Sequence, residues 1–279
     1  MAETTSSFSH WNKHARQWQH VKAPLRPCAE DLALIVEALA RHFPDRATLN
    51  GLLLGVTPEL AENRWAHVLR LVAVDNTLAM IQGVWPKDDE HRHAICGDWL
   101  QLPLNDASMD VALIDGGLPA MSFPDAYRQL ATQLHRVLKP GGLFVTRIFA
   151  RPENAETVGN VLAALQSRQI GNFHILKWRL AMALQGDDAS TGVRLDDIWR
   201  YIDKHCGQHA GLAQMTGWPI EEIGTIDAYR GSSAIYQFPS VGELVGAFGA
   251  KLDCVEEKRC TYELAERFPT LVFRKTAAP

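Results

Sequence analysis

The sequence has no long hydrophobic run and no cluster of basic residues, and each absence excludes a class of protein. The first segment, MAETTSSFSH, lacks the apolar centre of a signal peptide, and no apolar stretch is long enough to span a bilayer. The net charge is −4 and the pI is about 6.3, whereas a nucleic-acid-binding protein usually carries a basic stripe. We therefore expect a cytoplasmic protein that binds neither membranes nor nucleic acid.

Cysteine is scarce and unpaired in the sequence. The chain has 5 cysteines, an odd number, and no CxxC pair. Disulfide frameworks usually have an even number of cysteines, and many zinc sites use CxxC pairs. We therefore predict reduced thiols and no metal site. The glycine fingerprint GxGxxG is also missing, which argues against a dinucleotide-dependent oxidoreductase. The cysteines are Cys28, Cys96, Cys206, Cys254 and Cys260.

The sequence is rich enough in apolar residues to form a large core. It has 279 residues, of which 47% are apolar, and one domain with insertions is the simplest organisation. Between residues 46 and 150, apolar runs such as LLLGV, RLVAVD and MDVALID alternate with helical patterns such as FPDAYRQLATQLHRVL. This alternation predicts an α/β fold, a doubly wound and mostly parallel sheet with helices on both faces.

The pattern changes after residue 150. Residues 151–238 have helical patterns without intervening strands and are too long for a plain crossover, so we predict a helical insert between the fifth and sixth strands. Residues 239–279 then add a helix, with Ser240 as its N-cap, and two strands that complete a seven-stranded sheet. Residues 1–45 form an N-terminal helical segment and residues 46–150 the core.

Four segments of the core share their content, order and spacing with one enzyme family. They are LLLGVTPEL, LVAVDNTLAM, ICGDWLQLPL and LHRVLKPGGLFVTRIF. In these segments the sequence resembles the class I S-adenosylmethionine-dependent methyltransferases. The resemblance implies a Rossmann-like, seven-stranded sheet that ends in an antiparallel hairpin. It also implies an enzyme with S-adenosyl-L-methionine as cofactor and S-adenosyl-L-homocysteine as product, which transfers a methyl group by in-line displacement.

The loop after the first strand, GVTPE, lies where the family has a glycine-rich turn against the cofactor. Gly55 matches the first family glycine, while Thr57 and Glu59 replace the later ones. Glu59 is a candidate partner for the ammonium group of the cofactor, and Arg26 is a candidate partner for its carboxylate. The alternative is a plain strand-turn-helix unit with Pro58 at the first helical position.

Asp75 ends the second strand, roughly twenty residues after Gly55, where nucleotide-binding α/β folds place an acid on the ribose hydroxyls. A carboxylate can accept two hydrogen bonds from a vicinal diol. Asn76 follows it, and Met80 lies about one turn further on, where it can pack on the adenine edge. The alternatives are that Asp75 caps a helix and that Met80 is a core residue.

Three further residues follow the third and fourth strands. The resemblance implies that Asp98 accepts a hydrogen bond from the adenine amino group and that Trp99 lies beside the adenine ring. It also implies that Asp115 faces both the cofactor and the acceptor, which makes Asp115 a cofactor-binding and a catalytic candidate. The alternative for Asp115 is a strand-end aspartate that forms a turn.

The N-terminal segment and the insert are expected to close over the strand ends and to bind a small-molecule acceptor for O-, N- or C-methylation. His205 and His209 are four residues apart on one expected helix, and no third ligand supports a metal, so either is a candidate general base. The insert also allows a homodimer. Each aromatic or basic candidate for this pocket is an ordinary packing residue in the alternative interpretation: Trp11, Trp18, His20, Arg26, His174, Trp178, Trp199, Tyr201, Trp218, Tyr229 and Arg230.

Other functions remain open at this stage. The altered GVTPE loop favours a non-catalytic or regulatory protein of the same fold that binds the cofactor weakly. A protein or RNA methyltransferase is a second alternative, although the acidic charge balance argues against RNA. An aminopropyl transferase of the same fold is a third, but no acidic cluster suited to a polyamine is present.

Overall fold

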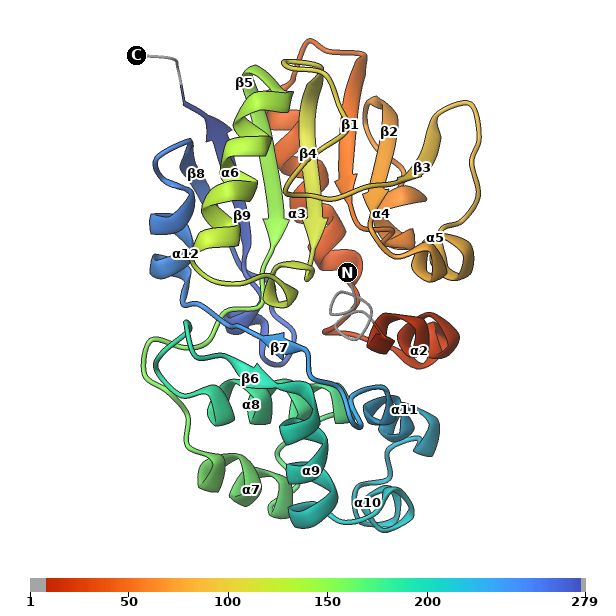
Figure 1. Cartoon of the computed structure of the whole chain (residues 1–279), viewed down its shortest axis with the longest axis vertical. Coiled ribbons are helices and arrows are strands. Elements are labelled where there is room, and N and C mark those ends of the chain that lie inside the picture. The colour runs from red at the N-terminus through yellow and green to blue at the C-terminus, as the bar shows by residue number, and fades with distance from the viewer. Residues whose placement is uncertain (1–8, 277–279) are drawn as a thin grey trace.

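The computed structural model describes residues 9–276, which form a seven-stranded sheet with flanking helices and a separate group of helices (Figure 1). The strands lie in the order β3-β2-β1-β4-β5-β9-β8. Their bounds are β1 (Thr48–Leu54), β2 (Val68–Asp75), β3 (Arg92–Cys96), β4 (Met109–Asp115), β5 (Leu138–Arg147), β8 (Leu252–Lys258) and β9 (Thr270–Lys275).

The five strands from β1 to β5 pair in parallel, and β9 runs antiparallel between β5 and β8. This confirms the predicted mostly parallel sheet with a final antiparallel hairpin. The chain moves outward from β1 to β3 and then returns to the other side of β1 as β4. Strands β1 and β4 therefore flank the switch point, where an α/β sheet opens a crevice beyond its carboxyl ends.

The side chains of β1 explain why helices cover both faces of the sheet. Leu52 and Leu54 pack in one buried cluster with α6 (Asp125–Val137) and α12 (Val241–Phe248). Leu49 and Leu53 point to the opposite face, where they join a cluster with α3 (Ala29–His42), α4 (Pro58–Ala61) and α5 (Leu78–Val84). Because successive side chains of a strand alternate between faces, an apolar run such as LLL requires cover on both sides.

The insert forms its own buried cluster, which lies beyond the carboxyl ends of β1, β4 and β5 (Figure 1). It was predicted to lack strands, and this was wrong, because two short strands pair there as an antiparallel hairpin. The element bounds are α7 (Val158–Gln166), α8 (Phe173–Gln185), β6 (Val193–Arg194), α9 (Leu195–His205), α10 (His209–Thr216), α11 (Ile220–Gly224), η3 (Thr225–Ala228) and β7 (Ile235–Tyr236).

The N-terminal segment contributes helix α2 (Ser9–Gln17) and the short 3-10 helix η1 (Trp18–His20). Helix α2 packs against both α5 of the core and η3 of the insert, so the segment bridges the two parts of the molecule. Residues 1–8, which include most of the polar segment MAETTSSFSH, lie outside the described residues.

Two local predictions about helix starts are confirmed. Ser240 is the N-cap of α12, and its hydroxyl and the Glu243 carboxylate form a reciprocal capping box. Pro58 occupies one of the first two positions of α4. Among residues 9–276, no helix is long and apolar enough to cross a membrane.

Candidate cofactor and acceptor site

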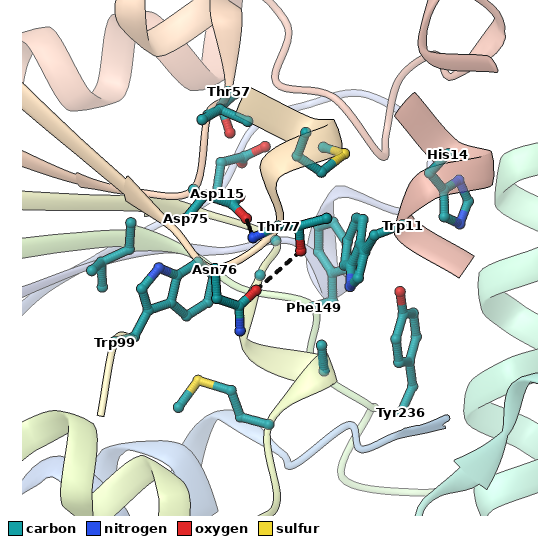
Figure 2. Close-up of a pocket in the computed structure, with 18 of the residues that line it drawn as sticks. Trp11, His14, Thr57, Asp75, Asn76, Thr77, Trp99, Asp115, Phe149 and Tyr236 are labelled. Carbon is teal, nitrogen blue, oxygen red and sulfur yellow. Dashed lines mark hydrogen bonds between the residues drawn. The ribbon is translucent and has the colours of Figure 1, made fainter. Parts of the chain in front are cut away.

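A cavity of about 540 Å³ lies at the carboxyl ends of β1, β2 and β4. Core residues line one side of it, and residues of α2, α8, β7 and the segment after η3 line the other. Figure 2 shows Asp75, Asn76 and Trp99 on the core side, with Trp11, His14 and Tyr236 facing them across the cavity. The cavity is therefore enclosed jointly by the sheet, the N-terminal segment and the insert.

Gly55 shapes the floor of the cavity at the end of β1. Its φ is 92°, a left-handed conformation that glycine adopts without strain. A Cβ at this position would stand 3.7 Å from the Trp99 ring and 4.0 Å from Asp75 Oδ2. The glycine thus keeps the space between these two side chains open, as a close approach of ligand to backbone requires.

Asp75 ends β2 and is buried, with 9% of its surface exposed. Its Oδ1 accepts a hydrogen bond of 2.7 Å from the backbone N–H of Thr77, which is the N-cap of α5. Burial raises the pKa of Asp75 to about 6, although the hydrogen bonds from Thr77 oppose this shift. The alternative that Asp75 is itself the N-cap is wrong, because Thr77 is the N-cap and the Asp75 carboxylate accepts from the backbone N–H of Thr77.

Asp98 and Trp99 form a tight turn after β3. Asp98 Oδ1 accepts a 2.9 Å hydrogen bond from the backbone N–H of Leu100. The Trp99 indole N–H donates to the carbonyl of Val74 at 2.7 Å, which fixes the ring at the end of β2. A Cβ on Gly117 would lie 2.8 Å from the same ring, so the close packing of the indole also depends on that glycine.

Three other predicted cofactor residues line the same cavity. Thr57 precedes α4 and is buried. The Asn76 side-chain oxygen accepts a 3.0 Å hydrogen bond from the Thr77 hydroxyl. Met80 is buried on α5, in the cluster with α3, and also lines the cavity; it is a core residue, and its packing on the adenine stays a prediction.

Asp115 lines the cavity but is paired beneath it with Arg147, at the end of β5. The guanidinium donates from Nε to Oδ1 at 2.6 Å and from Nη2 to Oδ2 at 3.1 Å. Burial raises the pKa of Asp115, and the charge of Arg147 opposes the shift. Because both carboxylate oxygens accept from Arg147, the side chain is held in place and has little freedom to take a proton from an acceptor.

Arg26 and Glu59 do not line the cavity; they form an ion pair with each other. The Arg26 guanidinium also lies over the Trp18 ring, at 5.4 Å from its centroid. The sequence predicts separate partners for the two residues on the cofactor, whereas the structure uses each charge to neutralise the other. The pair links the N-terminal segment to α4.

His205 and His209 also lie outside the cavity lining. The prediction that they share one helix is wrong, since α9 ends at His205 and α10 begins at His209. His205 stacks on Tyr201 at 4.3 Å between ring centroids, and His209 lies 3.5 Å from Asp227. The structure therefore gives both histidines contacts within the insert and does not bring them to the cavity.

Sequence reasoning missed several cavity residues, among them His14, Lys177 and Tyr236. Burial lowers the pKa of Lys177 to about 7. Burial and the charge of Lys177 hold the pKa of His14 well below its usual value. Of the 13 residues of α8, 10 are buried and Lys177 is one of them, and a buried lysine requires an explanation.

Comparisons with known proteins agree with this geometry. Residues 52–146 match the model of the family described as a methyltransferase domain. No curated protein matches the chain. The matched residues contain the end of β1, all of β2, β3 and β4, and most of β5.

Solved structures with similar folds cover nearly the whole chain at low identity. A Haloferax volcanii methyltransferase, solved in complex with the Trm112 methyltransferase activator, has 15% identity and a TM-score of 0.53, with 98% of this chain and 97% of that chain covered. The N-methyltransferase NodS from Bradyrhizobium japonicum WM9, solved with S-adenosyl-L-homocysteine, has 13% identity and a TM-score of 0.50. The match covers 96% of this chain and 100% of NodS. A Rhodobacter sphaeroides protein described as a Zn-dependent alcohol dehydrogenase has 12% identity and a TM-score of 0.57, and the match covers 95% of this chain and 99% of that protein. At such identities the likeness shows the fold alone.

The residues at the strand ends fit S-adenosylmethionine on structural grounds. Asp75 is a buried carboxylate that accepts from a single residue, and a ribose diol would supply the two further donors that stabilise its charge. Gly55 keeps open the space beside this carboxylate. The cavity also offers the Trp99 indole and Met80 as an apolar surface for the adenine.

Proposed function

We propose that the chain, in which residues 52–146 match the model of a methyltransferase domain, is a class I S-adenosylmethionine-dependent methyltransferase that methylates a small molecule held between the sheet and the insert. The observation that carries the proposal is one cavity that Asp75 and Gly55 of the core line together with His14, Lys177 and Tyr236. Donor and acceptor can occupy one enclosed space there. Such enclosure is typical of sites for small molecules.

The core residues have distinct proposed roles in holding the cofactor. Asp75 accepts hydrogen bonds from the ribose, and Asp98 accepts one from the adenine amino group. Trp99 and Met80 flank the adenine, while Gly55, Thr57 and Asn76 shape the space for the rest of the molecule. When bound, S-adenosylmethionine supplies a methyl group on a positively charged sulfur.

Asp115 has a positioning role in this proposal. Its carboxylate lines the cavity and is held in one orientation by Arg147. Neither His205 nor His209 has a role, since neither lines the cavity. The chain's contribution to the reaction is therefore to orient two ligands and to exclude water from them.

Calorimetric titration of the purified protein tests the cofactor part of the proposal. We expect micromolar affinity for S-adenosylmethionine and S-adenosylhomocysteine and no heat with NAD, which is the control. Binding of NAD alone, or of none of the three, would contradict the proposal. Release of S-adenosylhomocysteine in the presence of a metabolite panel then tests transfer, and transfer only to protein or RNA would contradict the small-molecule acceptor.

A further inference from the structure

Buried hydrogen-bond donors of the N-terminal segment and of the insert lie around the cavity. Lys177 Nζ and the indole N–H groups of Trp18 and Trp178 are buried and have no hydrogen-bond partner within residues 9–276, and all three residues line the cavity. Buried donors are nearly always satisfied in folded proteins, by protein, water or ligand. Three unsatisfied donors around one cavity indicate a ligand that supplies acceptor atoms.

Lys177 is the strongest of these three observations. Its side chain is fully buried, and within residues 9–276 no carboxylate pairs with its amine. The centroid of the Tyr229 ring, which also lines the cavity, lies 5.2 Å from Nζ. A cation–π contact offsets only part of the cost of burying an ammonium group, which normally has an ionic partner.

The other titratable groups around Lys177 supply no negative charge. Burial, and then the charge of Lys177, lower the pKa values of His14 of α2 and His174 of α8, so both histidines are neutral at pH 7. Burial raises the pKa values of Tyr229 and Tyr236, which therefore remain protonated. None of these four neighbours therefore supplies a negative charge to Lys177.

The walls beside Lys177 are flat and aromatic. Trp178 stacks on Tyr236 at 5.8 Å with an angle of 11° between the ring planes, and Phe149 lies 5.0 Å from Trp178. Tyr229 meets Tyr236 edge-on at 6.0 Å. Such walls favour a planar, apolar molecule, because aromatic rings gain most from offset or edge-on contact with other rings.

We infer that the methyl acceptor is a planar, aromatic acid whose anionic oxygen is bound by the Lys177 ammonium group at the insert side of the cavity. This inference rests on the proposed function, since it assigns the acceptor's chemical class within the same cavity. The carboxylate or phenolate oxygen completes the missing ion pair and accepts from the unsatisfied donors. The ring lies between the aromatic walls.

The test compares benzoate with benzamide, which has the same shape and no charge, on protein saturated with S-adenosylhomocysteine. Calorimetry on the wild-type protein is expected to give at least about tenfold tighter binding of benzoate. In Lys177→Met the two probes should bind within twofold of each other. The matched control Lys204→Met, on the exposed surface of α9, should keep the wild-type preference.

A second measurement needs no variant and covers the case in which Lys177→Met fails to fold. The pKa of Lys177 is about 7, and an anion beside it favours the charged form. Between pH 6.5 and 8.5 the wild-type affinity for benzoate should therefore fall by roughly tenfold, with proton uptake on binding, while the affinity for benzamide stays constant. His14 and His174 remain neutral and the tyrosines remain protonated over this range.

The outcomes separate this inference from the proposed function. A wild-type protein that does not distinguish the two probes, whether it binds both or neither, overturns the inference. A preference for benzoate that survives in Lys177→Met overturns it as well. Failure to bind S-adenosylhomocysteine in the first place overturns the proposed function instead.

Discussion

At the scale of single residues, Asp75 lies in an environment that opposes its charge in the absence of a ligand. It is buried, it accepts from one neighbouring residue, and its pKa is about 6 instead of 3.8. A shift of this size corresponds to up to about 3 kcal/mol of unfavourable free energy when the group is ionised. Functional groups are commonly held in such destabilised states, because the ligand supplies the missing interactions.

Asp75→Asn is expected to stabilise the free protein and to weaken its binding of S-adenosylhomocysteine. Asp75 ionises near pH 3.8 in the unfolded chain and near pH 6 in the folded protein. Its burial therefore does not destabilise the folded protein below pH 3.8, and the destabilisation reaches its full value above pH 6. The variant's melting temperature should therefore exceed that of the wild type increasingly as the pH rises from 4 to 7. Thermal melts over this range measure the effect, and a difference that shrinks with rising pH would contradict it.

Binding of S-adenosylhomocysteine should weaken in the wild type as the pH falls through 6. The ribose hydroxyls donate to an ionised Asp75, whereas a protonated carboxyl group has lost part of its capacity to accept. Below pH 6 we expect the affinity for S-adenosylhomocysteine to fall by up to about tenfold for each pH unit. Calorimetric titrations from pH 5 to pH 8 measure it, and Asp75→Asn is the control, because its affinity should be low and independent of pH.

Gly55 permits a separate test, because the chain contains a matched control. Gly55 and Gly207 have nearly the same φ, 92° and 91°, but Gly207 has no atoms within 4 Å of a Cβ and lies between α9 and α10. Alanine at either position should destabilise the protein by about 1–2 kcal/mol through backbone strain. Gly55→Ala alone should also lose affinity for S-adenosylhomocysteine; equal affinities in both variants would refute a cofactor contact there.

The residues of the core side were predictable because each follows a strand. Asp75 and Asp115 are the last residues of β2 and β4, and the carboxyl ends of parallel strands meet at one edge of a sheet. The insert side was not predictable, since Lys177 and Tyr236 are brought to the cavity by the packing of α8 and β7. No local pattern in the sequence encodes that packing, and the Arg26–Glu59 pair escaped prediction for the same reason.

At the scale of elements, Arg147 ties three parts of the chain together at the end of β5. Its guanidinium pairs with Asp115 of β4, and its Nη1 donates to the carbonyl of Pro24 at 2.6 Å and lies 3.9 Å from Asp31 of α3. All of these groups are buried around a fully buried arginine. The contact with Pro24 connects the sheet to the segment that follows η1.

Arg147→Met should destabilise the protein by about 3–5 kcal/mol, because it leaves the Asp115 carboxylate buried without its partner. The double variant Arg147→Met with Asp115→Asn should recover part of this loss, since the uncompensated charge is removed. Urea denaturation of both variants gives the two free energies of unfolding. If the double variant is no more stable than Arg147→Met, the unpaired charge is not the cause.

The strands and helices of the core were predictable from hydrophobic periodicity, as LLL in β1 illustrates. The β6–β7 hairpin was not, since each strand has two residues and the partners are more than 40 positions apart in the sequence. Periodicity needs a longer run to appear. The break between α9 and α10 was missed as well, because His205 and His209 suit the spacing of one helix equally well.

At the scale of the whole molecule, the cavity exists only because the sheet, the N-terminal segment and the insert meet. Helix α2 packs on α5 of the core and on η3 of the insert, and it contributes Trp11 and His14 to the cavity. A ligand that contacts both sides should therefore stabilise the closed arrangement of all three parts, in the way that ligand binding commonly orders loops and lids.

Hydrogen exchange measured by mass spectrometry tests this coupling between the parts. Addition of S-adenosylhomocysteine should slow exchange at the ends of β1 and β2 and also in α2 and in η3, although α2 and η3 lie outside the residues that match the methyltransferase domain. Helix α10, which lines no part of the cavity, serves as the internal control. Protection confined to the strand ends would mean that the N-terminal segment and the insert respond only to the acceptor, and the closure of the cavity would then depend on the second ligand.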